Sequence, residues 1–415
     1  MGTATSSSRI SLVMSGGGAR GAYEAGVLSY LFDELPALLG RPTHFDIVTG
    51  TSVGAVHACW VAATQDDPNA GRRLTELWSS LSLEQVFPVG VTDVFRVPWR
   101  LLGFGGVSGW LPAREDNAPD RLPGLFDTTA LESIVLAQIP WEQLHRNLDE
   151  GRLYALAVAA TEIATGRSVV FVDTPCGTVP RWAGNPFVVA RAARIGPEHA
   201  LASAAIPLIF PAVRVDHSYC YDGGLRLNTP LAPALRLGAD RVLVIGLRYQ
   251  RSAEEEDRIA RERLANYSSL TYLSGKALNA LLLDRVEHDV DRLRLFNAIL
   301  ERGVKAYGPE FLTRINEPIV TMRNTPYRIV ENVFVRPSKD IGAIAAECLE
   351  HKSPGRSARN WLSRSLARYA GRGSEGEADL LSYLFFDRCY VDHLIELGRH
   401  DAEQASEQFA KFFSP

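Results

Sequence analysis

The sequence predicts an α/β fold of three layers, with a mainly parallel central sheet between helices and further helices added after residue 250. Two observations lead to this prediction. Over the first 250 residues, short apolar runs alternate with helical patterns, which is the order of βαβ units. Glycine-rich turns stand where several of these apolar runs meet the helical patterns. The 415 residues, 46% hydrophobic and 22% charged, have the composition of an ordinary globular protein.

The first elements are the clearest. Ile10–Met14 is a short apolar-rich run and is expected to be a strand. Ala22–Leu35 is expected to be a helix, because large apolar side chains recur in it at four-residue spacing. Phe45–Val48 is the next predicted strand, and a helix follows it to about Thr64. Later strand candidates are Leu153–Thr161, Val169–Val172, Tyr219–Tyr221 and Arg241–Leu247.

Three parts are expected along the chain: a disordered tail over residues 1–9, a domain over 10–250, and a mainly helical extension over 251–415 that packs on the core. In the extension, Glu254–Leu300, Asp340–His351 and Leu380–Phe413 have helical patterns, and Asn332–Val335 resembles one more strand. Val86–Leu111 has no clear period. It is interpreted either as a lid or lipid-contacting loop, or as a packed surface loop.

Composition excludes several classes of protein. A net charge of -4 argues against a nucleic-acid-binding face. No apolar run approaches the ~20 residues that span a bilayer, and with a strand expected from Ile10 we expect no secretory signal peptide. The five cysteines are scattered without metal-ligand spacing, so the sequence predicts reduced thiols, no metal site and a cytoplasmic protein.

The first motif is Gly16–Gly21, which has the spacing G-x-G-x-x-G between a strand and a helix. Its bare backbone N–H groups, beside the positive end of a helix dipole, suit either a phosphate or an oxyanion. A dinucleotide site would also need an acidic residue about 20 positions later, at the end of the next strand. That strand instead runs into Thr49-Gly50-Thr51-Ser52, which disfavours the dinucleotide interpretation.

The second motif is Gly50-Thr51-Ser52-Val53-Gly54, a G-x-S-x-G between a strand and a helix. A nucleophile in such a tight turn needs small residues two positions away on each side, because the turn brings them together. The same turn would point the helix N-terminus towards developing negative charge. The alternative is a serine with only a structural role in a turn.

The third motif is Tyr221-Asp222-Gly223-Gly224. A carboxylate within hydrogen-bond reach of a serine hydroxyl can act as its base, and two glycines allow the chain to turn sharply beside it. Taken alone, a β-turn aspartate explains the pattern equally well. None of the nine histidines stands in a glycine-flanked loop, so each is interpreted as structural, with His57 pointing away from the serine hydroxyl or into the core.

Together and in this order, the three motifs resemble those of the patatin-like acyl hydrolases. Other stretches are also similar to that family, among them Leu125–Thr128, Ala202–Pro207 and Pro337–Gly342. The resemblance is strong over residues 10–250 and looser beyond them. It implies a Ser–Asp dyad with Ser52 as nucleophile and Asp222 as base.

The resemblance also implies an oxyanion hole formed by the backbone N–H groups of Gly16, Gly17 and Gly18, and no cofactor. Arg20 would position this loop or meet a phosphate headgroup, or else form a salt bridge on the helix surface. The remaining motif residues, Gly21, Gly50, Gly54, Gly223 and Gly224, would support these turns.

The function implied is hydrolysis of lipid acyl esters, of the phospholipase A or lysophospholipase type, through an acyl-serine intermediate. A catalytically silent lipid-binding protein of the same fold, and a nucleotide-binding oxidoreductase that uses Gly16–Gly21, are the alternatives. Lys352–Gly373 is basic with interleaved aromatic and aliphatic residues, which indicates either peripheral contact with an anionic membrane surface or a solvated linker. The oligomeric state is left open.

Overall fold

The computed structural model of the chain describes residues 8–86, 120–122, 128–179, 182, 186–207, 209–262, 286–350 and 382–414. Two segments with open interpretations fall outside these ranges. They are residues 87–111 of the candidate lid and the whole of the basic stretch Lys352–Gly373.

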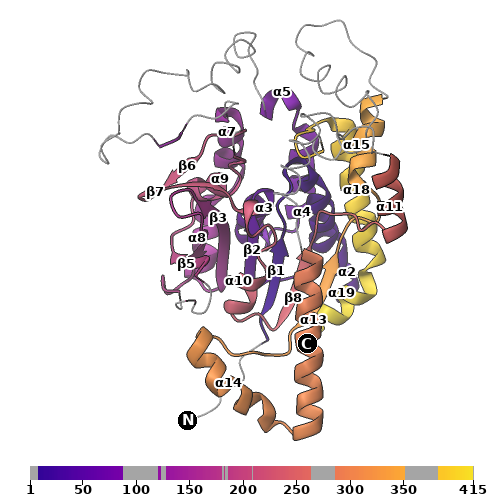
Figure 1. The fold of residues 1–415 in the computed structure, drawn as a ribbon. Helices are drawn as coiled ribbons and strands as arrows, with labels where there is room; N and C mark the ends of the chain where they lie inside the picture. Colours follow the sequence, from indigo (N-terminus) through magenta and orange to yellow (C-terminus); the bar gives the residue numbers. More distant parts are fainter. Residues whose placement is uncertain are drawn as a thin grey trace, which may run out of the picture.

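A nine-stranded sheet forms the centre of the molecule (Figure 1), and its main path has the order β5-β4-β3-β2-β1-β8-β9. Strand β1 pairs in parallel with β2 and β8, β2 with β3, β4 with β5, and β8 with β9. The pairs β3–β4, β3–β7 and β6–β7 are antiparallel. The prediction of a mainly parallel sheet is confirmed. The strands are β1 (Ile10–Met14), β2 (Ile47–Thr51), β3 (Ala155–Glu162), β4 (Ser168–Asp173), β5 (Val188–Ala192), β6 (Val213–Val215), β7 (Ser218–Asp222), β8 (Arg241–Ile245) and β9 (Glu331–Val335).

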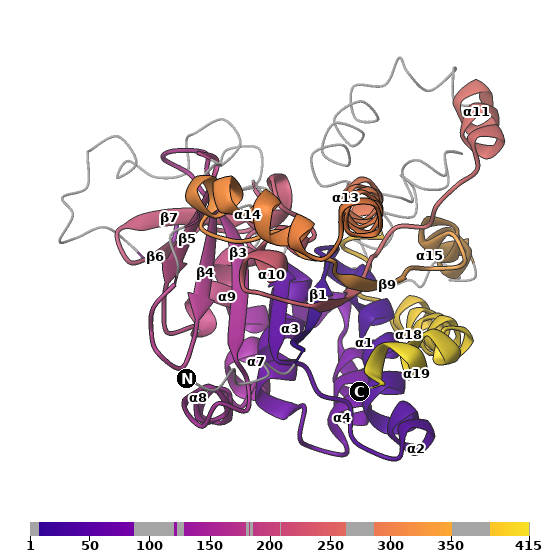
Figure 2. The same cartoon turned by 90° about the horizontal axis from the view of Figure 1, so that it is seen from below.

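Helices cover both faces of this sheet, which gives the three layers. Side chains alternate along β1, so that Leu12 and Met14 belong to one buried cluster while Val13 belongs to the cluster on the opposite face. Figure 2 shows the two helical layers on either side of the strands. The first cluster is completed by α1 (Gly21–Ser29), α3 (Val53–Thr64), α4 (Ala70–Ser80) and α18 (Arg388–Gln404), and the second by α10 (Leu231–Arg236) and α13 (Val286–Tyr307).

The helix expected over Ala22–Leu35 is interrupted. Helix α1 ends at Ser29, a π-helical turn follows over Tyr30–Glu34, and α2 (Leu35–Leu39) continues to a left-handed Gly40. Pro36 stands near the start of α2 and has no N–H to donate to the preceding turn. A wider turn at this point is consistent with that missing hydrogen bond.

The part of the chain after residue 250 adds both a strand and helices to the fold. Strand β9, expected from the sequence, extends the sheet at β8. Helix α18 crosses α1 so closely that a Cβ on Gly26 would lie 2.2 Å from the carbonyl oxygen of Ile395, and one on Gly398 would lie 2.2 Å from that of Tyr23. The remaining helices are α5 (Leu83–Val86), α7 (Thr129–Gln138), α8 (Trp141–Asp149), α9 (Pro197–Ser203), α11 (Ala253–Glu262), α14 (Glu310–Arg323), α15 (Ile341–Glu350) and α19 (Ser406–Phe413).

Among the described helices, none has the length and apolar character that crossing a membrane requires. The division of the chain at residue 250 stays a prediction.

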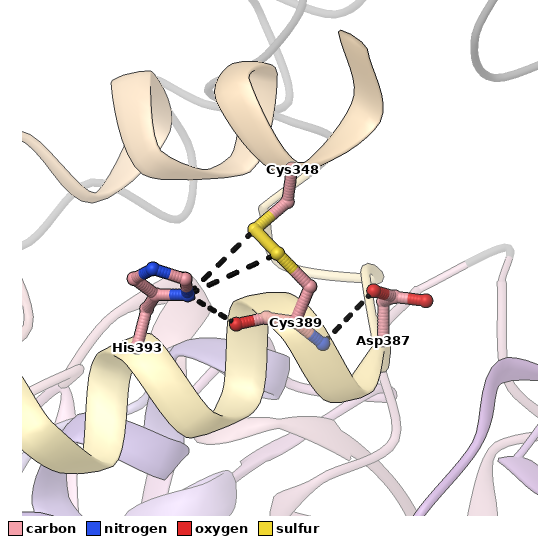
Figure 3. The surroundings of a disulfide bond; sticks show 4 residues. All are labelled: Cys348, Asp387, Cys389 and His393. Carbon is pink, nitrogen blue, oxygen red and sulfur yellow. Dashed lines mark hydrogen bonds between the residues drawn. A yellow bond between two sulfur atoms is a disulfide. The ribbon is translucent and has the colours of Figure 1, made fainter. Parts of the chain in front are cut away.

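The prediction of five reduced, unpaired cysteines is wrong for one pair. Cys348 of α15 and Cys389 of α18 form a disulfide (Figure 3), while Cys59, Cys176 and Cys220 are free. The two bonded residues are 41 positions apart in the sequence, and their Cα atoms are 6.0 Å apart. Because only the packing of α15 beside α18 brings them together, no local spacing could have indicated the pair.

Candidate active site

Ser52 lies in the sharp turn between β2 and α3, just past the carboxyl end of the strand. Its φ of 56° and ψ of -126° are rare for a residue with a side chain, so the surrounding packing must hold the turn. A Cβ on Gly50 would lie 2.0 Å from the carbonyl oxygen of Gly54, and one on Gly54 would lie 2.6 Å from that of Met14. The two glycines of the second motif are therefore required by close backbone contacts.

Asp222, the last residue of β7, lies beside Ser52 although 170 positions separate them. The Ser52 hydroxyl donates to Asp222 Oδ2 at 2.6 Å, and the Gly224 N–H donates to Asp222 Oδ1 at 2.7 Å. A Cβ on Gly223 would lie 2.3 Å from the carbonyl oxygen of Ala159, so β3 passes directly against this turn. The sequence predicted this contact between the two side chains.

The environment of Asp222 sets its basicity. The residue is 2% exposed, and burial raises the pKa of its carboxyl group to about 6, although the hydrogen bonds from Ser52 and Gly224 act in the opposite direction. Within the described residues, no histidine hydrogen-bonds to either Ser52 or Asp222. The site therefore offers a carboxylate, rather than an imidazole, as the group next to the hydroxyl.

The glycine loop between β1 and α1 lies against Ser52. A Cβ on Gly16 would be 3.0 Å from Ser52 Cβ, and Gly18 has a left-handed φ of 57°. The Gly16 N–H already donates to the carbonyl oxygen of Asn228 at 3.0 Å, so the expectation that Gly16 contributes to an oxyanion hole is wrong. The N–H groups of Gly17 and Gly18 have no partner within the part of the chain that the structure describes.

Arg20 connects the glycine loop to the C-terminal segment at Ser382 and Tyr383. Its guanidinium donates to Ser382 Oγ at 2.8 Å and stacks over the ring of Tyr383, and the residue is only 4% exposed. The adjacent Ala19 N–H donates to the Tyr383 carbonyl oxygen at 2.8 Å. Burial therefore contradicts the expectation that Arg20 lies on the helix surface and places it between the loop and the C-terminal segment.

The three motifs thus lie next to one another in the folded chain. Comparison with known proteins shows which family has them. The family model for patatin-like phospholipases matches residues 12–235, which contain all three motifs. The chain belongs to the patatin-like phospholipase family.

Two curated relatives share this patatin-like phospholipase region. A cGAMP-activated phospholipase of Pseudomonas aeruginosa is 33% identical over 226 residues, which are 53% of this chain and 53% of that protein. A cGAMP-activated phospholipase of Escherichia coli is 26% identical over 234 residues, which are 53% of this chain and 52% of that protein. The chain matches about half the length of each of these relatives.

Two solved structures to which the chain is similar have low sequence identity to it. VipD from Legionella pneumophila is 14% identical with a TM-score of 0.29, over 91% of this chain and 66% of that chain. Human GIVD cytosolic phospholipase A2 is 13% identical with a TM-score of 0.39, over 98% of this chain and 59% of that chain.

Two polar residues of this patatin-like site were not singled out from the sequence. Ser203 Oγ accepts the Ser52 N–H at 2.8 Å and donates to the Ala159 carbonyl oxygen at 2.5 Å, so it connects the turn at Ser52 to β3. Asn228 Nδ2 donates to the Gly16 carbonyl oxygen at 3.1 Å, which joins the glycine loop to the chain after Asp222. Ser203 lies in the stretch Ala202–Pro207 that carried the resemblance, but that pattern gave no indication of its contacts.

A series of buried polar side chains, joined by hydrogen bonds, leads to the start of the glycine loop. Trp78 Nε1–H donates to His57 Nε2 at 2.9 Å, and because an indole nitrogen only donates, the proton of the imidazole lies on Nδ1. That nitrogen contacts Glu24 Oε2 at 2.7 Å, and Glu24 Oε1 accepts the Ser15 N–H at 2.9 Å. Burial raises the pKa of Glu24, and the hydrogen bonds from His57 and Ser15 oppose this shift. His57 therefore supports the start of the loop, as a structural histidine.

An apolar pocket opens beside Ser52. Helices α3, α4 and α7 form most of its walls, and the segment before α18 closes one side. Lining side chains include Val56, Trp60, Leu74, Ile134, Leu384 and Phe386. This apolar lining suits a hydrocarbon chain.

Proposed function

We propose that this protein hydrolyses acyl esters of membrane lipids, with Ser52 as nucleophile and Asp222 as general base. The observation that carries the proposal is the 2.6 Å hydrogen bond between these two side chains at the apolar pocket. A serine hydroxyl is a weak nucleophile unless a neighbouring base takes its proton. The pKa of about 6 for Asp222 leaves it ionised at neutral pH yet basic enough for this role.

In the first half of the reaction, Ser52 Oγ attacks the ester carbonyl carbon while its proton passes to Asp222 Oδ2. The carbonyl oxygen becomes an oxyanion, which accepts hydrogen bonds from the N–H groups of Gly17 and Gly18 and faces the N-terminal end of α3. The C–O bond to the alcohol then breaks, and the leaving oxygen takes the proton from Asp222. The products of this step are the free alcohol and acyl-Ser52.

In the second half, a water molecule attacks the acyl carbon and gives a proton to Asp222. The tetrahedral intermediate is stabilised by the same two N–H groups. When it breaks down, Ser52 Oγ takes the proton back and the fatty acid is released. Each proton that Asp222 accepts is thus returned within the same half of the cycle.

The pocket suggests the substrate class. Its walls are almost wholly apolar, so burying an acyl chain there is favourable by roughly 0.8 kcal/mol for each CH₂ group. Because the ester must lie at Ser52 with its chain in this pocket, we propose phospholipids or lysophospholipids as substrates. Access to them also requires peripheral contact with a membrane surface, which flotation with anionic and neutral vesicles would test.

The experiment is a lipid panel of phospholipid, lysophospholipid and neutral ester, assayed for released fatty acid with and without cGAMP, because both curated relatives are named for that activator. Ser52→Ala should abolish release in every condition, whereas Ser133→Ala, at an exposed serine that donates to its own helix, should not. Labelling of Ser52 by a fluorophosphonate probe would separate an enzyme from a catalytically silent lipid-binding protein. Undiminished hydrolysis by Ser52→Ala would overturn the proposal.

A further inference from the structure

A cluster of two cysteines and one histidine stands between α15 and α18, and the proposed catalysis uses none of its members. Cys389 and His393 are one turn apart on α18, and Cys348 faces them from α15 (Figure 3). His393 Nδ1 is 3.8 Å from Cys389 Sγ and 4.0 Å from Cys348 Sγ. All three potential ligand atoms lie within 4.8 Å of one another.

These distances are close to those of a tetrahedral zinc site. Zinc binds thiolate sulfur at about 2.3 Å and imidazole nitrogen at about 2.0–2.1 Å, so ligand atoms on one ion lie roughly 3.5–3.8 Å apart. Two of the three separations in the cluster are already close to that range. Only the two sulfur atoms must move apart, which reduction of their bond permits.

We propose that, when the disulfide is reduced, Cys348, Cys389 and His393 bind Zn²⁺, with water at the fourth position. Reduction by a small thiol breaks the S–S bond and gives two cysteine thiols, while two molecules of the reductant are joined as their own disulfide. Zinc binding then releases the two thiol protons. Thiolate and imidazole ligands favour zinc over magnesium or calcium, which prefer oxygen.

Local structure around the cluster agrees with this chemistry. Cys389 is the second residue of α18, after an Asp387 side chain that accepts its N–H at 3.1 Å, and a helix N-terminus stabilises a thiolate. His393 Nδ1–H now donates to the Cys389 carbonyl oxygen at 2.7 Å. To bind the ion, the ring must turn from this oxygen and carry its proton on Nε2, and the exposed position of His393 leaves room for that rotation.

The proposal concerns a reducing environment, in which the pair would be present as thiols. Cys176 is exposed and in no disulfide, and hydrogen bonds with Thr178 and Thr174 lower the pKa of its thiol to about 7. A thiol of this kind oxidises readily where disulfides are stable. In reducing compartments, neighbouring cysteines more often bind metals or catalyse reactions than form structural disulfides.

The cluster lies close in sequence to the C-terminal wall of the proposed active site. Phe386, three residues before Cys389, lines the apolar pocket, and the Tyr383 carbonyl oxygen accepts the Ala19 N–H. Either link, the disulfide or the zinc ion, would fasten the start of α18 to α15. Zinc would thus preserve in reducing conditions the connection that the disulfide provides in oxidising ones.

The test uses the full chain, treated with a chelator, reduced with a phosphine and titrated with Co²⁺ as a spectroscopic substitute for Zn²⁺. We expect one equivalent of Co²⁺ to give thiolate-to-metal charge-transfer absorption and the visible bands of a tetrahedral ion, both removed by added Zn²⁺. The oxidised chain is the matched control, because it keeps the fold but has no thiolate at this position. It should give neither band.

Variants assign the ligands. Cys348→Ser and Cys389→Ser should each lose the charge-transfer band or weaken it strongly. His393→Gln should lower the affinity for Co²⁺ by at least about 10–100-fold, because the loss of an outer-shell partner of a ligand already costs that much. Cys176→Ser should leave the titration unchanged. The proposal is overturned if the reduced chain gives no thiolate band, if the oxidised chain binds Co²⁺ equally well, or if Cys176→Ser is the variant that removes the band.

Discussion

Replacing Asp222 by asparagine should inactivate the protein and, at neutral to alkaline pH, stabilise its fold. Both effects have one cause, which is the buried carboxylate beside Ser52 Oγ. Asparagine has nearly the same shape but cannot take a proton from the serine. We expect hydrolysis to fall by at least about 10²-fold, the lower end of the usual contribution of a general base.

The magnitude of the stability effect follows from the pKa of Asp222. Burial raises it from an ordinary value of 3.8 to about 6, and each unit corresponds to about 1.4 kcal/mol. The folded state holds this proton more tightly than the unfolded state, so the free energy of unfolding decreases as the pH rises through 6. Above that pH, ionised Asp222 lowers it by about 3 kcal/mol, and below about pH 4 the effect is absent.

Asparagine removes this penalty but weakens one hydrogen bond, a loss of about 1 kcal/mol. The net gain at pH 8 is therefore about 2 kcal/mol. For a chain of 415 residues that unfolds as one unit, 1 kcal/mol changes the Tm by roughly 1 °C. The difference in Tm between Asp222→Asn and the wild type should thus increase by about 3 °C from pH 4 to pH 8.

Ser52→Ala is the matched comparison, because it also inactivates the protein but leaves the carboxylate in place. It removes a hydrogen bond that lowers the pKa of Asp222, so it should reduce stability at pH 8, by about 1–3 kcal/mol. Thermal unfolding of both variants and the wild type across this pH range is the assay. If the two variants shift the Tm in the same direction at pH 8, or if Asp222→Asn hydrolyses lipid at the wild-type rate, the reasoning is refuted.

Three further predictions concern the same site and its support. Below pH 6, kcat/KM on a lipid ester should fall about tenfold per pH unit, because protonated Asp222 cannot accept the Ser52 proton; a flat pH profile from 5 to 7 would contradict this. Ser203→Ala removes the acceptor of the Ser52 N–H, so steady-state kinetics should show kcat lowered about tenfold with KM and the pH profile unchanged. A changed pH profile would mean that Ser203 takes part in proton transfer. Gly26→Ala would place a Cβ 2.2 Å from the Ile395 carbonyl oxygen, so α1 and α18 must separate. Denaturant unfolding should show that the free energy of unfolding falls by about 1–3 kcal/mol. An unchanged midpoint would show that the two helices adjust without cost.

Much of the fold was determined by the sequence alone, because it depends on local patterns. Strand β1 lies at the predicted residues Ile10–Met14, and α3 ends at the predicted Thr64. Strand β5 was missed, because it lies at the sheet edge, is only half-buried and leaves no long apolar run. Strand β6 has only three residues, too few for a pattern.

The candidate site also has features that the sequence predicted and features that it did not. The glycines of the three motifs are visible in the sequence because each stands where a Cβ would collide with nearby backbone, as at Gly50 and Gly54. Such steric requirements restrict the residue type at a position and so leave a pattern. The pairing of Ser52 with Asp222 followed from the resemblance that these patterns carry.

Only the tertiary structure decided which polar groups and cysteines are paired, and with which partners. It assigned the Gly16 N–H to Asn228, the Ser52 N–H to Ser203, and Cys348 to Cys389. These partners are brought together from distant parts of the chain, and many residue types supply a hydrogen-bond acceptor, so no local pattern marks them. Hydrogen-bond and disulfide partners depend on which distant groups the folded chain brings together. The glycine positions, in contrast, depend on whether the neighbouring backbone leaves space for a Cβ atom.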